Sequence, residues 1–65
     1  MHAPVQRLAD ASCMASARAW RTEAETLREH AQAAYLTERQ RVTLLREAEA
    51  ADRQAAWWLG AIGRH

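Results

Sequence analysis

The apolar residues of this 65-residue chain recur at alternating spacings of four and three, the period of helices that bury one face. Two such series occur: Cys13, Ala17, Trp20, Ala24, Leu27, Ala31 and Ala34, then Leu44, Ala48, Ala51, Ala55, Trp58 and Ile62. Nothing between Val5 and Leu59 breaks a helix, because glycine occurs only at Gly60 and Gly63 and the single proline is Pro4. Strand-like alternation is missing from the sequence, so the pattern predicts an all-α fold.

A turn must separate the two series, because one helix over the whole stretch would be about 80 Å long and could not cover its own apolar face. Thr37 and Gln40 match a capping box, in which each side chain satisfies the other residue's free backbone amide. The sequence therefore predicts one antiparallel helical-hairpin domain. Its expected parts are a short N-terminal helix or arm at 1–12, a helix from 13 or 14 to 35, a turn at 36–37, a helix from 38 to 59 or 60, and a tail at 61–65. A second match, Thr22 with Glu25, marks another break or lies within a helix.

Pairing the two series about this turn predicts the hairpin core. Ala24 is expected opposite Ala48, and alanine at so many positions would let the helices approach closely. Large side chains are expected to face small ones along the seam. The large side chains assigned to the core are Trp20, Leu27, Leu44 and Leu45.

The adjacent indoles of Trp57 and Trp58 cannot both enter one narrow seam, because neighbouring helical residues point about 100° apart. Trp58 continues the apolar series, and Trp57 falls to one side. Either residues 1–12 fold back over Trp57 or a partner chain covers it. The predicted partner interface comprises Val5, Leu8, Trp57, Trp58, Leu59 and Ile62.

Composition narrows the function. So short a chain with few large apolar side chains has little stability to spare, so we expect self-association or a partner. The net charge is +1, with basic and acidic residues interspersed, so nucleic-acid binding through Arg18, Arg21, Arg28 and Arg46 is the third choice. The sequence shows no signal-peptide pattern and no run of about 18 apolar residues, and 57–65 lacks the basic face of a membrane-surface helix. A cytoplasmic location without membrane attachment is expected.

Residues that carry chemistry are sparse. The three histidines, His2, His30 and His65, are far apart and lack neighbouring ligands, so no metal site is predicted. The single cysteine, Cys13, excludes an internal disulfide and has no base placed to activate it. There is also no glycine-rich loop for a phosphate. We therefore expect no enzymatic activity, no cofactor and no small-molecule substrate.

The size of the chain, its short N-terminal piece and its hairpin turning at Leu36-Thr37-Glu38-Arg39-Gln40 resemble the small E-type co-chaperones of type III secretion needle subunits. The resemblance covers most of the chain and rests on size, helical layout and turn position. It implies that the hairpin docks on a larger tetratricopeptide-repeat chaperone and helps to keep the needle protein from polymerising. Trp57, Trp58, Leu59 and the N-terminal residues would then be candidates for the docking surface.

The leading interpretation is a bacterial protein–protein interaction module: an adaptor, co-chaperone or inhibitor that buries an apolar helix flank against a helical partner. The alternative is a self-contained homodimer, in which two hairpins form a four-helix bundle with a regulatory role of the kind that phages and plasmids encode.

Overall fold

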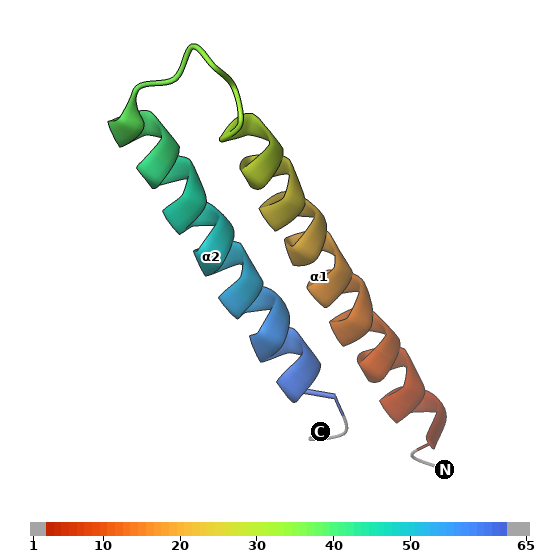
Figure 1. Ribbon diagram of the computed structural model, residues 1–65. Helices are drawn as coiled ribbons and strands as arrows, with labels where there is room; N and C mark the ends of the chain where they lie inside the picture. Colours follow the sequence, from red (N-terminus) through yellow and green to blue (C-terminus); the bar gives the residue numbers. More distant parts are fainter. Residues whose placement is uncertain (1–2, 63–65) are drawn as a thin grey trace.

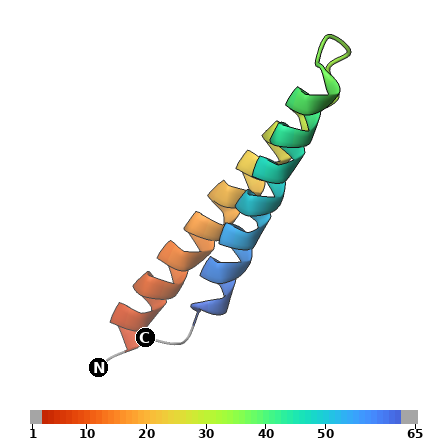
Figure 2. The ribbon, with the colours of Figure 1, turned by 90° about the vertical axis from the view of Figure 1, so that its left-hand side faces the viewer.

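The computed structural model describes residues 3–62, with side chains from residue 7 onward. It is a helical hairpin of two antiparallel helices, α1 (Ala3–His30) and α2 (Glu38–Gly60), which lie side by side and are joined by a loop at 31–37 (Figure 1; Figure 2). Residues 3–62 contain no strand. The predicted all-α hairpin is therefore confirmed, with α2 beginning and ending where the sequence indicated.

Residues 3–12 do not form a separate helix or arm. Residues 3–12 are the first turns of α1, which runs without a break through Thr22. Helix-forming residues dominate this stretch, and Pro4 lies in the first turn, where its missing N–H leaves no hydrogen bond unmade. The predicted division between 1–12 and a later helix is therefore wrong for residues 3–12.

The end of α1 also differs from the prediction, because the helix stops at His30 rather than at 35. The amides of Gln32 and Ala33 bond to carbonyls three residues back, at 3.1 Å each, which tightens the chain out of the helix. The guanidinium of Arg41, on α2, donates to the carbonyl oxygens of Ala31 and Ala33. Carbonyl oxygens at the end of a helix need hydrogen-bond donors, and here the donor comes from the other helix.

The start of α2 follows the sequence signal. The Thr37 hydroxyl accepts from the Gln40 amide at 3.1 Å, and the Gln40 side-chain oxygen accepts from the Thr37 amide at 2.8 Å. Glu38 adds a negative charge to the first turn, where it favours the helix dipole. The capping box therefore fixes the start of α2 by contacts within four residues.

The seam between the helices is built from small side chains. The buried residues are Cys13, Ala17, Ala24, Ala31, Ala48, Ala51 and Ala55. Ala24 packs against Ala48 and Ala51, as expected, and Leu27 covers this cluster from the side. The Cα atoms span 13 Å across the hairpin, and two cylinders of about 2.3 Å radius then leave about 8 Å between the axes.

This close approach excludes large side chains from the centre of the seam. Trp20 and Leu45 are 38% and 41% exposed, while Leu27 and Leu44 are half-buried. The expectation that all four would fill the core is therefore wrong. Backbones held this close by alanine leave no room for an indole or isobutyl group between them, so these side chains lie along the edges of the seam.

Candidate interaction surface

The seam is flanked on one side by a shallow hollow of about 330 Å³ between the helices. Its lining comprises Trp20, Glu23, Leu27, Glu47, Ala50, Ala51 and Gln54. Trp57 follows Ala50 by seven residues, or two helical turns, and so extends the same side of α2. We call this side of the hairpin the tryptophan face: the lining of the hollow together with Trp57.

The tryptophans of this face are not absorbed by the fold. The exposed fraction is 38% for Trp20 and 60% for Trp57, while Trp58 is half-buried. The rings of Trp57 and Trp58 meet edge to face, with centroids 4.9 Å apart and planes at 86°. Trp58 therefore lies closer to the seam and Trp57 to the outside, as the helical spacing predicts.

A second hollow, of about 420 Å³, lies at the turn end of the hairpin. Leu36, Arg39, Gln40, Thr43 and Leu44 line it, and we call it the turn-end hollow. Thr43 precedes Ala50 by seven residues, just as Ala50 precedes Trp57, so the turn-end hollow opens on the tryptophan face. This face thus carries a hollow near the turn, a second one at mid-length, and Trp57 toward the open end.

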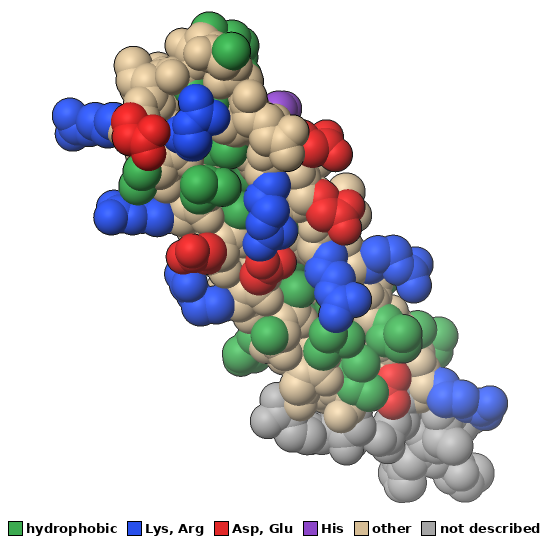
Figure 3. All heavy atoms as spheres, in the orientation of Figure 1, with side chains coloured by type: hydrophobic (Ala, Val, Ile, Leu, Met, Phe, Trp, Pro, Cys, Tyr) green, Lys and Arg blue, Asp and Glu red, His purple; other side chains and the backbone are tan. Residues whose placement is uncertain are grey.

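The opposite side of the seam is bridged by charged groups. Arg28 of α1 forms an ion pair with Asp52 of α2. The side chain of Arg41 crosses from α2 to the chain just after α1, and its Nε lies 3.9 Å from Oε2 of Glu38. We call this side, defined by Arg28, Asp52 and Arg41, the arginine face. Figure 3 shows basic side chains along its seam, and hydrophobic ones gathered toward the open end.

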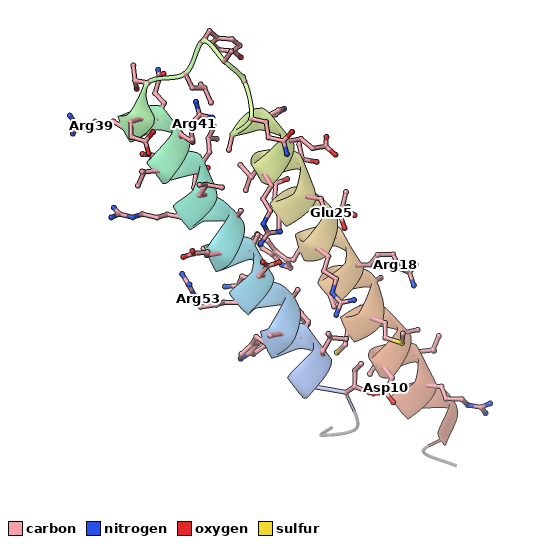
Figure 4. The ribbon with its side chains drawn as sticks, in the orientation of Figure 1. Asp10, Arg18, Glu25, Arg39, Arg41 and Arg53 are labelled. Carbon is pink, nitrogen blue, oxygen red and sulfur yellow. The ribbon has the colours of Figure 1, made fainter. Side chains whose placement is uncertain are left out.

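The side chains labelled in Figure 4 show how charge is distributed around the hairpin. Arg18 and Glu25 extend from the outer side of α1, and Arg39 and Arg53 from the outer side of α2. Asp10 instead points toward the gap between the helices near the open end. The outer sides therefore carry charged side chains, and Arg39, which also lines the turn-end hollow, lies where the tryptophan face meets the outer side of α2.

The structure brings together only part of the predicted partner interface. Leu8 is 73% exposed but lies twelve residues before Trp20, which turns it about 120° away from the tryptophan face. Leu59, two residues after Trp57, is turned about 200° from it. Ile62 is half-buried, and the side chain of Val5 lies outside the described side chains. The six residues therefore do not form one patch, although Trp57 and Trp58 remain neighbours.

Sequence reasoning missed Arg41 and the turn-end hollow. The seven-residue spacing of Thr43, Ala50 and Trp57 is visible in the sequence and is the signal that could have revealed the face. Nothing in the sequence near Arg41 indicates its carbonyl contacts, because they join residues eight and ten positions apart across the loop.

Within residues 3–62 no three histidine, cysteine or acidic side chains come close enough to hold a metal ion, and neither helix has the length and apolar character needed to cross a membrane. Comparison with protein-family models, curated proteins and solved structures found no match to this chain. The resemblance to E-type co-chaperones stays a prediction.

Proposed function

We propose that this chain is a protein–protein interaction module that packs a helical partner against its tryptophan face. The observation that carries the proposal is where the large apolar side chains lie. Among the described side chains, the buried ones are all alanine or cysteine, while Trp20 is 38% exposed and Trp57 is 60% exposed. Large aromatic side chains left outside a small core are typical anchors of interfaces.

The shape of the face suits a helix. A helical partner contacts a groove through residues three, four and seven positions apart, and the tryptophan face repeats at the same period along α2. Its central hollow lies between the two helices, where a third helix packs in a bundle. An adaptor, co-chaperone or inhibitor of this kind works by burial and needs no catalytic group. A cytoplasmic setting and a tetratricopeptide-repeat partner belong to the same proposal through the resemblance to E-type co-chaperones.

The test uses the full chain and a synthetic amphipathic helix with leucine and alanine at its core positions, compared with a peptide of the same composition in scrambled order. We expect calorimetry to show binding of the amphipathic peptide alone. Trp57→Ala should weaken binding at least about tenfold, because interface tryptophans are frequent hot spots. Leu45→Ala is the matched control, since Leu45 is exposed but outside this face.

Equal binding of both peptides would contradict the proposal, because it would show general stickiness rather than a face that recognises a helix. Unchanged affinity in Trp57→Ala, with weakened affinity in Leu45→Ala, would move the interface away from the tryptophan face.

A further inference from the structure

The hairpin exposes more surface than a globular chain of its mass. Its accessible area is 5093 Å², whereas a folded monomer of 7.4 kDa is expected to expose about 4,200 Å². The excess, about 900 Å², is close to the roughly 800 Å² that each partner buries in a standard protein–protein interface. One further contact of ordinary size would therefore bring the chain to the exposure of a compact protein.

The tryptophan face is also self-complementary in its layout. Trp57 projects toward one end and the turn-end hollow lies toward the other, centred near residue 41 and about 24 Å away along α2. The midpoint between them is near residue 49, beside the Ala50 and Ala51 that line the central hollow. Consider a two-fold axis that passes through this midpoint, lies in the face and is perpendicular to the helices. It places Trp57 of one copy over the turn-end hollow of the other.

We propose that the partner covering the tryptophan face is a second copy of this chain, packed antiparallel, with Trp57 of each copy seated in the turn-end hollow of the other. This inference rests on the proposed function and places a second copy where the resemblance to E-type co-chaperones would place a tetratricopeptide-repeat protein. The hollow of about 420 Å³ has room for an indole, since a cavity of about 150 Å³ holds a benzene ring. Arg39, on its rim, is placed to stack on that indole.

The same two-fold axis pairs the rest of the face consistently. Because the axis passes near residue 49, two α2 residues lie opposite each other when their numbers add up to about 98. Gln54 of one copy therefore lies near Thr43 and Leu44 of the other. Because Ala24 packs against Ala48 and Ala51, the axis crosses α1 near Ala24. Trp20 of one copy then lies within about one residue of the level of Leu27 of the other. Large apolar groups therefore meet on both helices.

The arginine face does not offer a comparable contact. Burying it would remove from water the ion pair of Arg28 and Asp52, whose side chains are 44% and 46% exposed. The guanidinium of Arg41 would be desolvated with them, and such a cost is seldom recovered. The tryptophan face and its turn-end hollow carry Glu23, Glu47 and Arg39, and none of these three side chains bridges the two helices, so burying this face breaks no such bridge.

The first experiment is sedimentation equilibrium of the full chain across micromolar concentrations. We expect a dimer, and we expect Trp57→Ala to weaken dimerisation at least about 100-fold because two hot-spot contacts are lost per dimer. Leu45→Ala is again the control and should shift the dissociation constant less than about threefold. Dimerisation that Trp57→Ala leaves intact would overturn the inference.

Cross-linking tests the antiparallel arrangement even if Trp57→Ala fails to fold. In a Cys13→Ala background, which keeps a small residue in the seam, Thr43→Cys and Gln54→Cys are made as separate variants. Oxidation should give disulfide-linked dimers when the two variants are mixed, and little when either is alone. Linked dimers of Thr43→Cys alone would indicate parallel copies and would overturn the inference.

The outcomes also separate this inference from the proposed function. A chain that stays monomeric yet binds the amphipathic peptide through Trp57 would overturn the proposed dimer and support the proposed interaction module. A chain that stays monomeric and does not bind the amphipathic peptide would overturn both the dimer and the proposed function.

Discussion

The two sides of the seam are made by the same pair of helices but are completed in opposite ways. On the arginine face, side chains from one helix reach the other: Arg28 pairs with Asp52, and Arg41 holds the end of α1. On the tryptophan face, one hollow lies between the helices, a second lies along α2 beside the turn, and Trp20 and Trp57 are exposed. The difference teaches that charged side chains bridge the two helices on one side of this hairpin, while the other side leaves Trp20 and Trp57 exposed, where we propose that a partner packs.

The largest effect is expected from enlarging the seam that supports both faces. Ala24 is fully buried against alanines of α2, so Ala24→Leu should force the helices apart and destabilise the hairpin by about 1–3 kcal/mol or more. Urea denaturation followed by circular dichroism measures the change. Ala15→Leu, at an exposed position of the same helix, should change stability by less than about 0.5 kcal/mol. Equal stability of both variants would show that the seam is not closely packed.

Arg41→Ala tests the arginine face where it meets the turn. The variant loses the donors to the carbonyls of Ala31 and Ala33, and we expect a cost of about 1–2 kcal/mol, allowing for the partial exposure of the guanidinium. Amide exchange at Gln32 and Ala33 should become faster as the end of α1 frays. Arg46→Ala, at an exposed site on α2, is the control. If both variants exchange alike, the end of α1 is held by local contacts.

Thr37→Ala tests the start of α2, beside the turn-end hollow on the tryptophan face. Removing the hydroxyl that accepts from the Gln40 amide should cost about 1 kcal/mol. Thr22→Ala offers a matched comparison, since Thr22 also heads a capping-box match but lies within α1. There we expect no loss, or a gain of a few tenths of a kcal/mol from the better helix propensity of alanine. A loss at Thr22 as large as at Thr37 would contradict the continuous helix.

The smallest effect is expected from the ion pair of Arg28 and Asp52. Both side chains are nearly half exposed, so a double-mutant cycle with Arg28→Ala and Asp52→Ala should give a coupling of about 0.5 kcal/mol or less. The coupling should fall further in 1 M salt, where the Debye length is about 3 Å. A coupling that is large and insensitive to salt would mean that the pair is covered in solution, and so would place the interface on the arginine face.

The features that the sequence predicted correctly depend on local or periodic signals. The capping box of Thr37 and Gln40 located the start of α2, and the four-and-three spacing of alanines located the seam. The same periodicity placed Trp58 nearer the seam than Trp57. These signals act within one or two helical turns, which is why a single sequence contains them.

The features that the sequence did not predict arise between the helices. The end of α1 at His30 is accompanied by carbonyl contacts from Arg41, a residue of the other helix. The exclusion of Trp20 and Leu45 from the core follows from how closely two alanine-lined backbones approach. The continuation of α1 through residues 3–12 has another explanation. The local helix preferences allowed it, but the predicted first helix was made only as long as the second helix could cover.

The alanine-lined seam reverses the usual relation between burial and sensitivity to mutation. In most domains, truncating a large buried side chain costs the most, and alanine scanning finds the core. Here the described side chains that are buried are alanine already, apart from Cys13. An alanine scan of this hairpin would therefore change nothing at most of its buried positions. Its largest effects would come from exposed positions such as the tryptophans.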